Sequence, residues 1–156
     1  MGSFSKIIPN PIIVNAYRVN PDRNKIVTVG SLKEQKNQQL LIDAMSDVLL
    51  DHPTAKLTIY GEGPLRGSLE KQIAELCIEK SVLLPGQKND IHEEIKNALF
   101  FVLSSDYEGL SNALLETMMM VIPCISTDCA GSDEYIENQI NGLLVPVKNK
   151  AALVEG

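Results

Sequence analysis

The sequence has 156 residues, of which 44% are hydrophobic and 22% are charged, so it is long enough for one globular domain with a sizeable core. Its formal net charge of −6 disfavours a broad nucleic-acid-binding surface, because neutralising phosphates requires clustered Lys and Arg. Nucleic acid is therefore not an expected partner, whereas a local basic pocket remains open.

The sparse cysteines and histidines predict neither a disulfide framework nor a metal site. Cys77, Cys124 and Cys129 form an odd set without a secretory segment, and His52 and His92 lie in separate segments. No apolar run approaches the length of a membrane span. We therefore expect a cytoplasmic protein with reduced thiols that requires no metal or cofactor.

The chain opens with an irregular lead-in and then changes to an alternating pattern. Residues 1–24 contain Pro9 and Pro11, which argue against a central strand, and a polar stretch rich in turn-forming residues. Residues 25–30, "KIVTVG", predict a buried strand that ends at glycine. The next segment, 37–52, repeats apolar residues along one helical face, which predicts an amphipathic helix.

The same alternation continues to the end of the chain. Further strands are predicted at 55–61, 82–86, 99–104, 123–127 and 142–147, and helices at about 65–80, 90–98 and 112–120. Apolar strands that alternate with helices are typical of a parallel sheet covered on both faces. With right-handed crossovers, the pattern predicts a doubly wound, Rossmann-like α/β domain.

The loop after the fourth strand carries the strongest candidate site, because all parallel strands end at the edge where ligands bind. Glu108 lies in this loop, Gly109 would let a ligand approach the backbone, and Ser111 or Asn112 would cap the next helix. A capped helix N-terminus attracts anions, and Glu116 follows about one turn into the helix. A nucleotide diphosphate-sugar fits this order. The alternatives are two solvated surface acids or a glycosidase-type carboxylate pair.

Two lysines precede the first helix, where positive charge is electrostatically unfavourable. Lys33 and Lys36 make sense there if an anion binds beside them. The alternative is a mobile loop in which Glu34 offsets the charge. By its position at the same edge, the pair Gly86–Gln87 is a further candidate for backbone contacts to a base.

Two glycine-containing segments carry weaker signals. "GEGP" at 61–64 lacks the spacing of a dinucleotide-binding fingerprint, so we interpret it as a tight turn with Pro64 opening the next helix. "AGSDEYI" at 130–136 is most simply another connection from a strand to a helix, although its edge position would also let it touch a ligand.

Taken in order, six segments resemble the retaining glycosyltransferases of family 4, also called group 1. The resemblance runs from about residue 25 to 147, in the segments "VGSLKEQKNQQLLIDA", "IYGEGPLRGSLE", "LLPGQKNDI", "FVLSSDYEGLSNALLE", "PCISTDCAGSDEYI" and "NGLLVPV". It implies a two-domain enzyme whose active site lies between two Rossmann-like domains.

On this resemblance, residues 25–156 are the C-terminal, donor-binding domain, and residues 1–24 are the segment that links it to an acceptor-binding N-terminal domain. That N-terminal domain would be missing here, so the chain alone would bind donor poorly and transfer little sugar. The donor would be a UDP- or GDP-sugar. A glycan or lipid-linked acceptor, and any membrane association, would depend on the missing domain.

The resemblance also implies roles for individual residues. Glu108 would contact the donor sugar and Lys36 the phosphates, both as catalytic groups, while Glu116 would hold the ribose hydroxyls. Further contacts to the sugar, phosphate and base would come from Gly109, Leu110, Ser111, Ser31, Gly86 and Gln87.

Ser31 is the main departure from the family pattern, which commonly has an arginine there. A neutral hydroxyl cannot replace the charge of a guanidinium group. Three alternatives follow: Lys36 and the helix dipole suffice, another cation compensates, or donor turnover is weak. Ala130, where glycine is common, is a lesser departure. Two other functions therefore stay open: a non-catalytic nucleotide-sugar binding module and a sugar-nucleotide epimerase.

Overall fold

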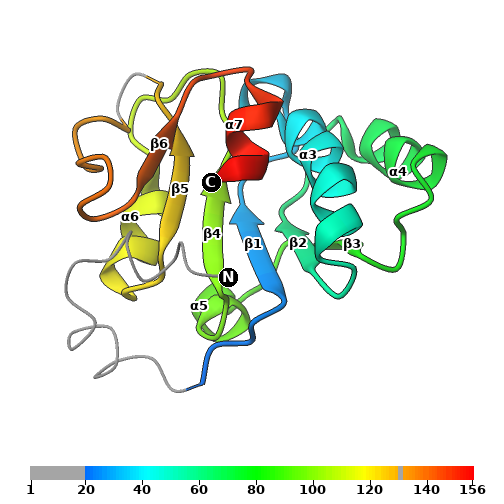
Figure 1. Cartoon of the computed structure of the whole chain (residues 1–156), viewed down its shortest axis with the longest axis horizontal. Coiled ribbons are helices and arrows are strands. Elements are labelled where there is room, and N and C mark those ends of the chain that lie inside the picture. Colours follow the sequence, from blue (N-terminus) through cyan, green and yellow to red (C-terminus); the bar gives the residue numbers. More distant parts are fainter. Residues whose placement is uncertain (1–19, 130–131) are drawn as a thin grey trace.

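The computed structural model describes residues 20–129 and 132–156, and its centre is a six-stranded parallel sheet (Figure 1). The strands run in the order β3-β2-β1-β4-β5-β6, and every neighbouring pair is parallel. Their bounds are β1 (Lys25–Val29), β2 (Lys56–Tyr60), β3 (Val82–Gly86), β4 (Phe100–Leu103), β5 (Cys124–Thr127) and β6 (Leu143–Val145). This order is that of a doubly wound, Rossmann-like domain, as predicted.

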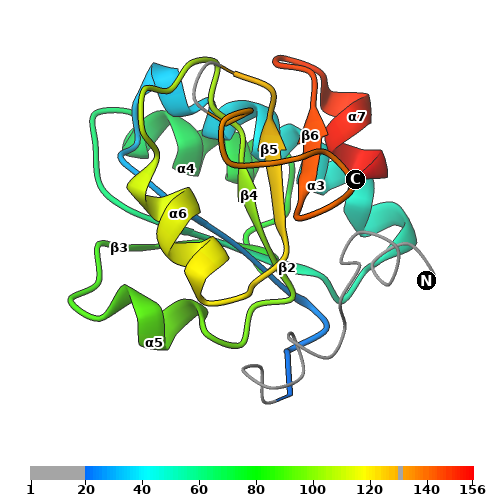
Figure 2. The same cartoon turned by 90° about the vertical axis from the view of Figure 1, so that its left-hand side faces the viewer.

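The helices lie on both faces of the sheet (Figures 1 and 2). One face is covered by α3, α4 and α7, and the opposite face by α5 and α6. Their bounds are α3 (Gln38–Asp51), α4 (Arg66–Glu75), α5 (Ile91–Ile95), α6 (Asn112–Met119) and α7 (Lys150–Glu155), and a short 3-10 helix, η1 (Glu34–Lys36), precedes α3.

The apolar strands form these two layers because successive residues point to opposite faces. In β1, Ile26 packs with the side chains of α3, α4 and α7, whereas Val27 packs with those of α5 and α6. In β4, Val102 belongs to the first cluster and Phe101 to the second. Every strand except the edge strand β3 therefore contributes to both cores, which explains why these strands are apolar throughout; in β3, Val82 and Leu84 pack in the first cluster, whereas Leu83 is 48% exposed.

Several predicted boundaries differ from the structure for local reasons. The helix predicted to reach residue 80 ends at Glu75, because Cys77 takes a left-handed φ of 56° that no α-helix can continue. Pro64 lies in the turn before α4, which begins only at Arg66. The helix α7 was not predicted.

The connection after β5 contains no helix in its described part, where a turn spans 132–135. Residues 1–19 of the predicted lead-in and Ala130 lie outside the described residues. Within the described parts of the chain, no helix is both long enough and apolar enough to pass through a membrane.

Candidate functional site

The site lies where the strand order reverses, between the neighbouring strands β1 and β4. The chain leaves β1 toward β2 on one side and leaves β4 toward β5 on the other, so the two outgoing loops separate there. Such a switch point is where open α/β sheets bind ligands. Lys36 comes from the loop after β1 and Glu108 from the loop after β4, so the topology brings these two predicted residues together.

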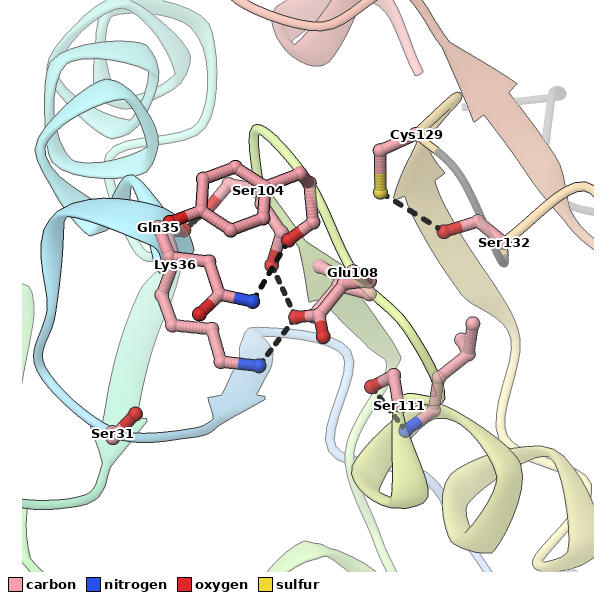
Figure 3. Close-up of polar contacts among 12 residues, drawn as sticks. Ser31, Gln35, Lys36, Ser104, Glu108, Ser111, Cys129 and Ser132 are labelled. Atoms are coloured by element: carbon pink, nitrogen blue, oxygen red, sulfur yellow. Dashed lines mark hydrogen bonds and ion pairs between the residues drawn. The ribbon is translucent and has the colours of Figure 1, made fainter.

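Lys36 and Glu108 form an ion pair between Nζ and Oε1, which Figure 3 shows at the centre of the site. The Glu108 side chain is only 5% exposed and that of Lys36 is 18% exposed. The same carboxylate oxygen accepts a hydrogen bond of 2.7 Å from Ser105 Oγ. Among the described residues, the carboxylate that pairs with Lys36 is therefore Glu108 rather than Glu34.

Hydrogen bonds join the two loops along their length. Two involve Gln35, whose carbonyl accepts from Asp106 N at 2.9 Å and whose side-chain amide donates to the Tyr107 carbonyl at 3.0 Å. Two more are donated by Asn37 Nδ2 to Asp106 Oδ1 at 2.8 Å and by Ser104 Oγ to the Lys36 carbonyl at 2.9 Å. The backbone on both sides of the ion pair is thus fixed before any ligand binds.

The helix α6 begins beside Glu108, at the predicted position. Ser111 is its N-cap, and its Oγ accepts a hydrogen bond from Leu114 N at 3.3 Å. A Cβ atom at Gly109 would meet no other atom within 4 Å, so the space beside this residue is open. Leu110 is 56% exposed beside it. The helix start predicted as an anion site is therefore preceded by open space at Gly109 and by the exposed Leu110.

Glu116 lies on α6 and does not join the Lys36–Glu108 pair. Its carboxylate lies 3.2 Å from His92 Nε2, and both side chains are about half exposed. His92 belongs to α5, so this contact links the two helices on that face of the sheet. This contact was not predicted, because nothing local in the sequence signals a pairing across 24 positions.

A cavity of about 300 Å³ opens at the carboxyl ends of β1, β2 and β3. This volume is at the lower limit for small-molecule sites. Its lining residues are Val29, Gly30, Ser31, Tyr60, Gly61, Glu62, Gln87, Lys88 and Ile91. The lining includes the predicted residues Ser31 and Gln87 but not Gly86, which directly precedes Gln87 and takes a left-handed φ of 88°.

The cavity wall carries both signs of charge. Glu62 is held by Arg66 at 2.8 Å, whereas Lys88 is exposed and has no ion-pair partner among the described residues. Burial, together with the nearby Glu94 carboxylate, raises the pKa of Tyr60 from 10.0 to about 12. Lys88 was not predicted, since an exposed loop lysine gives no signal of its own.

Comparison with known proteins identifies the family. The sequence model described as "Glycosyl transferases group 1" matches residues 10–156. The chain belongs to this glycosyltransferase group 1 family. The resemblance to the group 1 glycosyltransferases is therefore confirmed.

The relatives of this group 1 chain are longer proteins. An uncharacterized glycosyltransferase of Methanocaldococcus jannaschii is 34% identical over 136 residues, which cover 86% of the chain and 34% of the relative. An N-acetylgalactosaminyltransferase of Campylobacter jejuni, whose name specifies a diphospho-undecaprenol-linked acceptor, is 36% identical over 132 residues, 84% of the chain and 35% of the relative. The chain spans about a third of the length of these curated relatives.

A solved structure agrees with the fold. The TarM protein of S. aureus, crystallised as a mutant with fondaparinux, alpha-GlcNAc-glycerol and UDP, superposes with a TM-score of 0.81 at 26% identity. The match covers 89% of this group 1 chain and 29% of TarM.

Proposed function

We propose that this group 1 chain is the donor-binding domain of a retaining glycosyltransferase that uses a nucleotide diphosphate-sugar in glycan synthesis. The observation that carries the proposal is the Lys36–Glu108 pair at the switch point, beside the capped start of α6. The family match supports glycosyl transfer, and the UDP in TarM makes a UDP-sugar the first donor to test. A GDP-sugar is the alternative donor.

In this proposal the diphosphate lies on the first N–H groups of α6 and beside Lys36. Both stabilise negative charge, and the charge of a departing diphosphate grows as its bond to the sugar breaks. Glu108 faces the sugar. Glu116 accepts hydrogen bonds from the ribose hydroxyls, for which its exposed carboxylate is available. The cavity wall with Gln87 holds the base.

The balance of charge at the site supports a role for Lys88 in binding the diphosphate. Glu108 already offsets the charge of Lys36, and Ser31 is neutral, so a diphosphate would bring more negative charge than these residues balance. Arg66 is engaged by Glu62 and by Glu70, at 2.8 and 2.9 Å. Lys88 lines the same cavity as Ser31 and has no such partner among the described residues. We therefore assign Lys88 the role of the second cation that offsets the negative charge of the diphosphate.

Calorimetric titration of the chain with UDP and with GDP tests the proposal. We expect the chain to bind one of them weakly, since no acceptor-binding domain completes the site. Lys36→Ala and Lys88→Gln should each weaken that binding further, by about tenfold or more, because each removes a charged hydrogen-bond donor. The control is Lys71→Gln on α4, whose side chain is 77% exposed and pairs with Glu75.

Lys71→Gln should leave the affinity unchanged. Absence of binding to either nucleotide, or equal affinities across all three variants, would contradict the proposal. Nucleotide binding without any sugar transfer, in a protein that also carries an acceptor domain, would favour the non-catalytic module that the neutral Ser31 suggests.

A further inference from the structure

Glu108 is held asymmetrically, through one oxygen only. Oε1 accepts both the Lys36 ammonium and the Ser105 hydroxyl, and Figure 3 shows the dashed lines meeting at this atom. No described residue hydrogen-bonds to Oε2. Oε2 is not buried either. Among the described side chains, only Gln38 Oε1 and Gln72 Oε1 are both buried and without a hydrogen-bond partner. Oε2 is thus the accessible acceptor.

Ser105 is itself fixed by the neighbouring strand. It is 0% exposed, and its carbonyl accepts a hydrogen bond of 2.5 Å from Thr127 Oγ1 at the end of β5. Thr127 is also fully buried. The Thr127 hydroxyl at the end of β5 therefore fixes the backbone of Ser105, and the Ser105 hydroxyl in turn holds the Glu108 carboxylate.

We propose that Ser105 is a positioning residue that, together with Lys36, fixes Oε1 of Glu108 and so directs Oε2 toward the sugar of the donor. The inference rests on the function proposed above, in which Glu108 faces the sugar. A carboxylate without the Ser105 bond can rotate, and its Lys36 contact alone does not define which way Oε2 points. A lysine is a flexible point charge, whereas a buried serine on a fixed backbone defines a direction.

The test compares a ligand that has the sugar with one that lacks it. The affinities of UDP and of UDP-glucose, UDP-galactose and UDP-N-acetylglucosamine are measured by calorimetry, and the sugar that binds most tightly is kept. Ser105→Ala should weaken binding of this UDP-sugar by about tenfold or more, the usual scale for one hydrogen bond to a charged group, and leave UDP unchanged.

A double-mutant cycle separates positioning from a general structural effect. Glu108→Gln should also weaken the UDP-sugar alone, and adding Ser105→Ala to it should cost little more, because Ser105 acts through the carboxylate. The control is Thr117→Val, which removes another fully buried hydroxyl, one that bonds to the Ala113 carbonyl within α6. It should affect neither ligand.

If Ser105→Ala fails to fold, Thr127→Val replaces it, since it removes the donor to the Ser105 carbonyl with little change of volume. It should weaken the UDP-sugar selectively, and Thr127→Ser, which keeps the hydroxyl, should restore the affinity. Equal losses for UDP and UDP-sugar, or additive losses in the cycle, would overturn the inference while leaving the proposed function standing. A chain that binds neither ligand would overturn both.

Discussion

Lys36 and Glu108 form a pair that has been taken largely out of water. Removing such charges from solvent costs several kcal/mol per ion, and close pairing with further hydrogen bonds offsets this cost. Here the further bond comes from Ser105 at 2.7 Å. The ion pair as a whole therefore adds little net stability, but each charge needs the other to offset the cost of its burial.

This dependence gives a prediction for stability. Lys36→Met should lower the free energy of unfolding by about 3–5 kcal/mol, because it leaves a buried carboxylate without its cation. The double variant Lys36→Met/Glu108→Gln should lose clearly less. The matched control is Lys150→Met, whose pair with Asp47 at 2.8 Å is over 40% exposed on both sides.

Urea denaturation of the four proteins measures these differences. The midpoint of Lys150→Met should stay near that of the unmodified chain, because exposed ion pairs contribute little. A double variant as unstable as Lys36→Met alone would show that the loss comes from packing of the lysine stem rather than from an unpaired charge.

The residues that could be predicted from sequence are those marked by a local rule. Ser111 is an N-cap by residue type and position, and Lys36 stood out as a cation before a helix. Ser105, His92 and Lys88 follow no such rule. The contacts of Ser105 with Thr127 and of His92 with Glu116 join positions 22 and 24 apart, and Lys88 is known only from its place at the cavity, so only the folded chain reveals them.

Among the elements, α6 combines two roles that can be separated by mutation. Its cap, Ser111, supports the helix, and its free N–H groups form the proposed phosphate site. The helices α3, α5 and α7 have side-chain caps of the same kind, and in α7 Asn149 Oδ1 accepts from Ala152 N at 3.0 Å. We use α7 as the control because none of its residues is assigned a ligand contact.

Ser111→Ala and Asn149→Ala should each lower the free energy of unfolding by about 0.5–2 kcal/mol, the usual cost of losing an N-cap. Only the change at Ser111 should also weaken UDP binding. Ser111→Asp sharpens the comparison, because aspartate is a good cap and should keep stability, while its charge should repel the diphosphate. Thermal unfolding and calorimetry measure both effects. Tight UDP binding by Ser111→Asp would argue against a phosphate at this helix.

Among the secondary-structure elements, the strands could be predicted from the sequence, whereas some helix ends could not. All six strands were found because each is an apolar run, and all of them except the edge strand β3 contribute to both cores. The early end of α4 depends on the left-handed backbone of Cys77, which its residue type does not announce. The short helix α7 owes its place to packing on α3, where Leu153 joins the core, and six residues give too little periodicity to detect.

In the molecule as a whole, the sheet links the site to the cores. The strand order makes β1 and β4 neighbours, so the loops that carry Lys36 and Glu108 begin from the centre of the sheet. The strand residues beneath them are buried on both faces. Tyr60 belongs to this arrangement, because it packs in the cluster with Phe101 and Leu103 and also lines the cavity.

Tyr60 should therefore make the free energy of unfolding depend on pH in the alkaline range. Burial, and then the charge and hydrogen bond of Glu94, raise its pKa to about 12, so the folded chain holds this proton more tightly than the unfolded chain, in which the pKa is about 10.0. The stabilising contribution should be complete below pH 10 and disappear as the pH approaches 12. Tyr60→Phe should flatten the fall in denaturation midpoint over this range, whereas Tyr107→Phe, at a side chain that is 63% exposed, should leave it unchanged. A Tyr60→Phe curve that runs parallel to that of the unmodified chain would show that other groups control the alkaline loss.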